Sequence, residues 1–185
     1  MTSIMKPKVR NLRLYFMGMK RYKKGMYGGK FMPLHKGHEY CIRTACEECE
    51  TVFVILFHGG ADEERILAET REEWLSPKAR MAQIRRACEK YKGLAEVIPC
   101  EIDISGLKGL EGDEEWDAET PLVRAIVGER LDAVYGSEEA YGEYFKRAYP
   151  EAAYRLVDTG REKYPISGTL IRKMKNKGER EKWMV

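Results

Sequence analysis

Two of the three histidines in this 185-residue chain lie three residues apart, at His35 and His38. They stand in the stretch GGKFMPLHKGH, residues 28–38, which also contains a glycine pair, a lysine and a further glycine between the two imidazoles. Glycines let the backbone approach a ligand closely, because no Cβ stands in the way. A lysine adds a mobile cation, and side chains at spacing i, i+3 project from one face of a helix. This combination predicts a site that holds an anion such as a phosphate.

The stretch needs a strand before it and a helix after it, and the sequence predicts both. A short strand is expected near residues 25–31 and an apolar-periodic helix near 37–50, which places both histidines at the first helical turn. Free N–H groups and the helix dipole attract anions there. Further strands are expected at 51–57, 96–100, 132–135 and 154–157, further helices at 76–92, 118–130, 138–148 and from about 167, and polar loops at 58–75 and 105–115.

Strand–helix alternation of this kind predicts an α/β fold, with a Rossmann-like open parallel sheet and helices on both faces. In such sheets, ligands bind beyond the carboxyl ends of the strands, where the strand order reverses. A length of 185 residues suits one domain. We therefore expect a single domain over residues 25–185, preceded by a basic extension over residues 1–24 that is either disordered or docked on the domain.

Basic residues gather at the two ends of the chain. Residues 1–30 carry nine Lys or Arg and no acidic residue, residues 172–185 carry six basic and two acidic residues, and the part between is acidic. An evenly basic nucleic-acid-binding protein would not have this distribution. No apolar run approaches the roughly 18 residues that cross a membrane. Nucleic acid and membrane are therefore not expected partners.

The five cysteines are expected to be free thiols. Their odd number and the lack of a signal-peptide pattern favour a reducing compartment, so a cytoplasmic location is expected. Cys46 and Cys49 have the spacing of half a zinc site, but no second pair follows them. Cys41, Ile42, Ala45, Cys46 and Cys49 fall on one helical stripe, which favours burial in the core. No metal site built by the protein is expected.

The first stretch also carries a family resemblance. GKFMPLHKGH, residues 29–38, resembles the GxFxPxHxGH signature of the nucleotidyltransferase superfamily, and ISGTLIR, residues 166–172, resembles its second signature, ISGTxIR. Within the superfamily, the chain is most similar to the adenylyltransferase domain of NadR-type nicotinamide mononucleotide adenylyltransferases. YGSEE at 135–139, LVDTGR at 156–161 and Trp116 are similar to segments of that group.

The resemblance implies an activity and a set of site residues. AMP would pass from ATP to nicotinamide mononucleotide, giving NAD and pyrophosphate. Mg²⁺ would bind together with the ATP, and the protein would form a homo-oligomer. The implied catalytic residues are His35, His38, Lys30 and Arg172. The implied ATP-binding residues are Gly29, Phe31, His35, Gly37, His38, Ser167, Thr169 and Arg172, and the implied acceptor-binding residues are Lys30, Trp116, Tyr135, Ser137 and Glu138. The attacking phosphate is already an anion, so catalysis would consist of positioning and charge stabilisation.

Several alternatives stay open. The same fold and signatures serve other adenylyl- and cytidylyltransferases, with phosphopantetheine, FMN or an alcohol phosphate as acceptor. A non-catalytic nucleotide-sensing module is a further alternative, although the lysine, both histidines and the arginine of the signatures are intact. Ser167 could simply cap a helix, and Trp116 could simply pack. Arg80 could be a surface charge or could reach the nucleotide. We expect neither the repressor domain nor the kinase domain that NadR proteins often carry.

Overall fold

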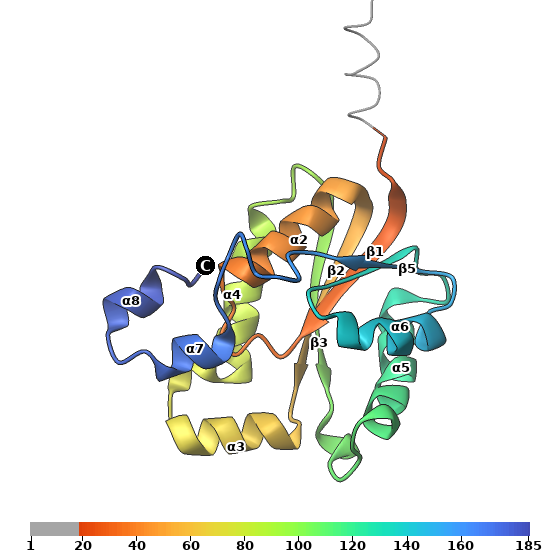
Figure 1. Ribbon diagram of the computed structural model, residues 1–185. Coiled ribbons are helices and arrows are strands. Elements are labelled where there is room, and N and C mark those ends of the chain that lie inside the picture. The colour runs from red at the N-terminus through yellow and green to blue at the C-terminus, as the bar shows by residue number, and fades with distance from the viewer. Residues whose placement is uncertain (1–18) are drawn as a thin grey trace, which may run out of the picture.

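The structure is a computed structural model that describes residues 19–185. At its centre, a five-stranded parallel sheet has the strand order β3-β2-β1-β4-β5 (Figure 1). Its strands are β1 (Tyr22–Gly29), β2 (Cys49–His58), β3 (Glu96–Asp103), β4 (Ala133–Gly136) and β5 (Ala153–Leu156). The predicted open parallel α/β sheet is thereby confirmed.

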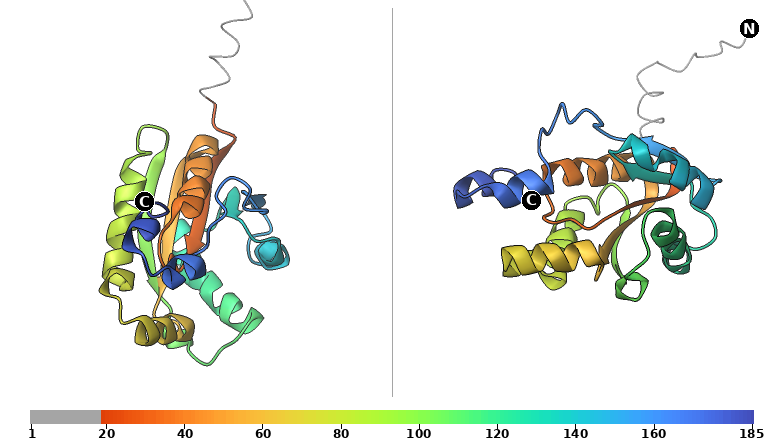
Figure 2. Two further views of the ribbon diagram at one scale, coloured as in Figure 1. Left: turned by 60° about the vertical axis from the view of Figure 1, so that its left-hand side comes forward. Right: turned by 60° about the horizontal axis from the view of Figure 1, so that its bottom comes forward.

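Helices cover both faces of this sheet (Figure 2). They are α2 (Lys36–Glu48), α3 (Ala61–Thr70), α4 (Pro77–Glu89), α5 (Asp113–Val127), α6 (Gly142–Ala148), α7 (Gly168–Lys173) and α8 (Lys177–Glu181). Helices α2 and α4 pack on one face, in a core cluster that includes Ile42 and Ile84. Helices α5 and α6 pack on the other face through Val123 and Phe145. No helix within the described residues is long and apolar enough to cross a membrane.

Local sequence signals explain the main elements. Residues 52–56 of β2 are all buried, as expected of a strand that is covered on both faces. The predicted stripe is buried in the core, with Cys41, Ile42, Ala45 and Cys46 on α2 and Cys49 at the start of β2, and all five cysteines are free thiols. Ser76 caps α4 by accepting a hydrogen bond from the N–H of Ala79, and Pro77 occupies the first helical position.

The predicted boundary between extension and domain is wrong by a few residues, because β1 begins at Tyr22 rather than near Gly25. The carboxylate of Asp132 accepts hydrogen bonds from the N–H groups of Lys23 and Lys24, at 3.1 and 2.9 Å. Nζ of Lys24 donates to the carbonyl of Val127 at 2.7 Å. These basic residues therefore belong to the sheet. Residues 1–18 of the predicted extension lie outside the described residues.

Two helices occupy positions that were predicted as polar loop. Helix α3 lies within residues 58–75, and α5 begins at Asp113 instead of near 118. Each has three acidic residues in its first turn, where negative charge interacts favourably with the helix dipole. The acidic character that indicated a loop is thus a helix-start signal in both places. The short helix α8, which follows Asn176 as its N-cap, was not predicted either.

Candidate active site

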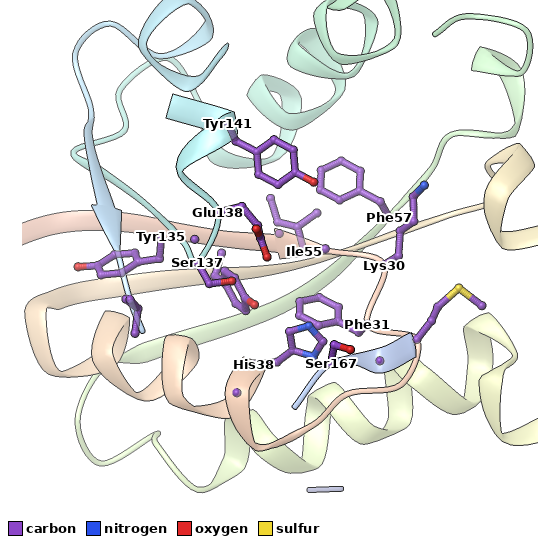
Figure 3. Close-up of a pocket in the computed structure, with 18 of the residues that line it drawn as sticks. Lys30, Phe31, His38, Ile55, Phe57, Tyr135, Ser137, Glu138, Tyr141 and Ser167 are labelled. Atoms are coloured by element: carbon purple, nitrogen blue, oxygen red, sulfur yellow. The ribbon is translucent and has the colours of Figure 1, made fainter. Parts of the chain in front are cut away.

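A cavity lies where the strand order of the sheet reverses, between β1 and β4. It has a volume of about 550 Å³ and is lined by residues that follow β1, such as Lys30, and by Ser137, which follows β4. Ser167, from the segment before α7, lies beside His38 at one side of the cavity (Figure 3). This is the position at which open parallel sheets bind ligands.

His35 is the N-cap of α2 rather than a residue of its first turn. Its Nδ1 accepts a hydrogen bond from the N–H of Gly37 at 3.2 Å, and a Cβ on Gly37 would lie only 3.1 Å from the His35 ring. The N–H of Lys36 donates to the carbonyl of Trp183 at 2.9 Å, where the chain returns across the start of the helix. Two of the N–H groups that were expected to face an anion are therefore occupied. The imidazoles themselves are the more available donors.

The rings of His35 and His38 are stacked, with centroids 3.6 Å apart and planes 22° apart. Phe31 packs edge-on against His38 at 5.1 Å (Figure 3). Burial and, secondarily, the charge of Arg161 lower the pKa of His35 to about 4. Burial, followed by the charges of His35 and Arg161, lowers the pKa of His38 well below its ordinary value.

Both imidazoles are therefore neutral near pH 7. Because Nδ1 of His35 accepts a hydrogen bond, its proton lies on Nε2 and can be donated to a ligand. Nδ1 of His38 is buried and has no hydrogen-bond partner among the described residues.

Arg172 joins the two signature segments, which are 140 residues apart in sequence. Its Nη1 donates to the carbonyl oxygen of Met32 at 2.5 Å, and its Nη2 donates to Oγ1 of Thr169 at 3.1 Å. Gly168 lies so close to Met32 that a Cβ on it would be 2.5 Å from the same carbonyl oxygen. Phe31, with a φ of 46°, turns the chain in the left-handed region just before this contact. The two segments thus form one structural unit beside the histidine pair.

Lys30 lies at the rim of the cavity (Figure 3), with its side chain 40% exposed and its Nζ 3.4 Å from a carboxylate oxygen of Asp62. Its backbone carbonyl accepts a hydrogen bond from Arg80, which is fully buried. Arg80 also forms an ion pair with buried Glu63 and donates to the carbonyl of Leu75. Both sequence-based interpretations of Arg80, as a surface charge or as a nucleotide contact, are therefore wrong. Arg80 instead holds the backbone from which Lys30 projects.

Ser167 is the N-cap of α7, and its hydroxyl accepts a hydrogen bond from the N–H of Leu170 at 3.2 Å. The simpler interpretation of this residue is thereby confirmed. Ser167 and Thr169 also line the cavity, together with Gly29 and Gly37. All of the predicted nucleotide-binding residues therefore line this one cavity.

The other side of the cavity is aromatic. Trp116 lies edge-on to Tyr141 and tilted against Tyr144, with ring centroids 5.2 Å apart in each pair. Tyr141 and Phe57 face His38 and Phe31 across the cavity (Figure 3). Trp116 thus packs against neighbouring rings and lines the cavity at the same time.

The residues of the YGSEE segment differ in how their side chains lie relative to the cavity. The hydroxyl of Tyr135 donates a hydrogen bond to the carboxylate of Glu48 at 2.9 Å. The ring of Tyr135 points away from Ser137 and Glu138 (Figure 3). Burial raises the pKa of Tyr135. Tyr135 lines the cavity, while its hydroxyl is held in the core by Glu48. Glu138 lines the cavity and forms an ion pair with Arg161 at 2.8 Å.

The strand order, the joined signature segments and the position of the cavity agree with one family. The model of the family described as cytidylyltransferase-like matches residues 26–174, which is most of the chain. The chain belongs to this family. It is an enzyme of the nucleotidyltransferase type.

Curated relatives of the chain include two trifunctional NAD biosynthesis/regulator proteins, both called NadR. The NadR of Escherichia coli (strain K12) is 30% identical over 170 residues, which are 85% of this chain and 39% of that protein. The NadR of Salmonella typhimurium (strain LT2) is 29% identical over 157 residues, which are 80% of this chain and 36% of that protein. The chain therefore spans less than two fifths of the length of these relatives.

Solved structures support the same fold. A NadR protein in complex with NAD and AMP-PNP matches 90% of this chain and 46% of its own, with a TM-score of 0.61 and 21% identity. A bifunctional NMN adenylyltransferase/ADP ribose pyrophosphatase from Francisella tularensis matches 82% of this chain and 41% of its own, with a TM-score of 0.55 and 18% identity. At these identities the likeness is one of fold.

The cavity residues that were not predicted as site residues from the sequence include Glu115, Glu119, Tyr141 and Arg161. A signal for Glu119 existed, because it falls at i, i+4 and i+8 with the buried residues Val123 and Val127 of α5. A carboxylate on an apolar stripe indicates either a buried partner or a ligand. Arg161 was noticed only as part of a resemblance, and nothing in the local sequence placed it beside the histidine pair.

Proposed function

We propose that this protein is a nicotinamide mononucleotide adenylyltransferase, which transfers AMP from ATP to nicotinamide mononucleotide and releases NAD and pyrophosphate. The observation that carries the proposal is the unlike character of the two sides of the cavity. One side offers the histidine pair and Ser167, which suit phosphates, whereas the other offers the rings of Trp116 and Tyr141, which suit a flat base, and Lys30 stands at the rim. The relatives named for NAD biosynthesis lend further support.

In this proposal, the chain acts by positioning and by stabilising charge. The phosphate of the mononucleotide attacks the α-phosphorus of ATP, the new P–O bond forms as the bond to pyrophosphate breaks, and pyrophosphate leaves with the negative charge. His35 and His38 donate hydrogen bonds to the phosphate oxygens as neutral imidazoles. Lys30, which moves away from Asp62, bridges the phosphates of both substrates.

Arg172 has a supporting role in this scheme, because two of its donors are already used on Met32 and Thr169. Its remaining N–H groups face the pyrophosphate, and its charge stabilises the leaving group. The described residues contain no group of three or more His, Cys, Asp or Glu side chains that could hold a metal ion. In this proposal Mg²⁺ is carried by the triphosphate, as Mg²⁺ in nucleotide sites usually is.

A panel of substrates tests the proposal. ATP or CTP is supplied with nicotinamide mononucleotide, phosphopantetheine, FMN or an alcohol phosphate, and both pyrophosphate and NAD are measured. We expect pyrophosphate and NAD in equal amounts with ATP and nicotinamide mononucleotide. Turnover with another acceptor but without NAD formation would refute the assigned acceptor, and no pyrophosphate with any pair would refute catalysis by this chain.

The histidine pair offers a matched site test. His38→Ala is expected to lower kcat by two to three orders of magnitude, roughly the cost of removing one preorganised donor. His58→Ala is the control, because His58 ends β2 and does not line the cavity. The His58 variant should keep wild-type turnover. Equal turnover of the two variants would contradict the role assigned to His38.

A further inference from the structure

Glu119 is an acidic residue of α5, the helix that also brings Trp116 to the cavity. It lines the cavity and is half-buried, and it shares the apolar face of α5 with Val123 and Val127. Glu115 lies one helical turn earlier on the same face and also lines the cavity. The two acidic residues therefore line the cavity from neighbouring turns of one helix.

Neither carboxyl group has a partner among the described residues, since no hydrogen bond or ion pair joins Glu115 or Glu119 to another side chain there. The other acids around the cavity differ in this respect. Asp62 pairs with Lys30, and Glu138 pairs with Arg161. A half-buried carboxyl group without a partner is costly, and functional sites are where such groups are retained.

The surroundings of Glu119 combine acidic and aromatic residues. Trp116 stands between the two acids in sequence, and its backbone carbonyl accepts hydrogen bonds from the hydroxyls of Thr120 and Tyr144, which fix this turn of the helix. Aromatic faces beside carboxylates attract a flat cation through the ring quadrupole and through charge. Burial and then Glu115 raise the pKa of Glu119 to about 7, and Lys30 opposes the shift. An approaching cation would favour the charged carboxylate, while an approaching anion would meet repulsion.

We propose that Glu119, supported by Glu115, determines which acceptor base is used: a cationic aromatic ring with a neutral substituent is bound, and the same ring with a carboxylate is rejected. This inference rests on the proposed function. The ring of nicotinamide mononucleotide is a pyridinium with an amide group, and the acid form of the mononucleotide replaces that amide with a carboxylate. Glu115 and Glu119 are thus specificity-determining residues for the amidated acceptor.

The test compares kcat/KM for the amidated and the acid mononucleotide, with saturating ATP at pH 8. Wild type should favour the amidated form. In Glu119→Gln this preference should shrink about tenfold, the effect of one nearby charge at moderate screening. The smaller preference should come from a higher KM for the amidated acceptor and a higher kcat/KM for the acid form. The kcat for the amidated form should change little. Glu115→Gln should act in the same direction and more weakly, and it serves as the second variant where Glu119→Gln does not fold.

Glu114→Gln is the matched control, because Glu114 is exposed on the same helix and does not line the cavity. The wild-type preference should also grow between pH 6 and 8, and Glu119→Gln should abolish that growth. A preference that is the same in Glu119→Gln, Glu115→Gln and Glu114→Gln would overturn the inference while leaving the proposed function intact. Wild-type enzyme that uses neither mononucleotide would overturn the proposed function, and the inference with it.

Discussion

Gly168→Ala is expected to damage catalysis far more than a single methyl group would suggest. The added Cβ would lie 2.5 Å from the carbonyl oxygen of Met32 and 3.3 Å from Nη1 of Arg172. Real Cβ contacts below 3.0 Å essentially do not occur and ordinary contact begins at 3.4 Å, so α7 and Met32 must separate by 0.5 to 0.9 Å. Overpacking of this kind costs about 1–3 kcal/mol of stability.

The larger effect falls on the site, because the same movement stretches the hydrogen bond between Arg172 and Met32, now 2.5 Å long. A displacement near 1 Å in a catalytic arrangement can cost about 100-fold in rate, so we expect kcat to fall by roughly 10- to 100-fold. Pyrophosphate release under saturating substrates measures the rate, and thermal unfolding measures stability.

Gly106→Ala is the control, because a Cβ on Gly106 would have no atom within 4 Å. That variant should match wild type in both assays. If Gly168→Ala keeps kcat within about twofold of Gly106→Ala, the close packing of the two signature segments does not position the catalytic groups, and the reasoning above is refuted.

Three further predictions concern stability and reactivity. Arg80→Met leaves Glu63 buried without a partner, so the free energy of unfolding measured with urea should fall by about 3–5 kcal/mol, and a loss no larger than that of exposed Arg85→Met would contradict this. The pKa of His35 is about 4 when folded against 6.5 when unfolded, so the unfolded state alone takes up a proton as pH falls between these values. Stability should therefore drop by roughly 3 kcal/mol from pH 7 to 4, with a shallower fall in His35→Asn, and parallel pH profiles of the two proteins would argue against it. Burial raises the pKa of the Cys41 thiol to about 11 and of the other four cysteines to about 11 or 12, so iodoacetamide at pH 8 should label the folded protein slowly and the unfolded protein at all five thiols. Rapid labelling of the native protein without loss of activity would disprove that protection.

The sheet could be predicted from the sequence because its signals are local. The apolar run of β2 and the Ser76–Pro77 helix start each depend on residues that are adjacent in the chain. The regular alternation then leaves few topologies for a parallel sheet. The position of the site followed from the same rule, since the glycine pair and the histidines stand at the end of a strand.

Contacts that join distant segments could not be predicted in this way. Arg80 stands on the apolar stripe of α4, and its charge was misread because its partner, Glu63, lies on a helix that the sequence did not reveal. Glu119 was missed although it lies on the apolar stripe of α5, because the sequence gives no partner or ligand for it. The stacking of the two imidazoles depends on where α2 begins, and a shift of one residue made His35 a cap. Such one-residue differences lie within the uncertainty of any helix boundary.

The contact between Arg172 and Met32 also has a consequence for folding order. It closes a chain segment of 140 residues, and loop closure of that length costs roughly 4 kcal/mol in chain entropy before any contact forms. Three of the four strand pairs, β1–β2, β2–β3 and β4–β5, require much shorter closures, so they can form before α7 docks. The fourth pair joins β1 to β4 across a long segment, from Gly25 to Ala133. During refolding from urea, tyrosine and tryptophan burial should therefore return before catalytic competence does. Activity in this protein would then report the completion of folding, whereas spectroscopic signals would report the formation of the sheet.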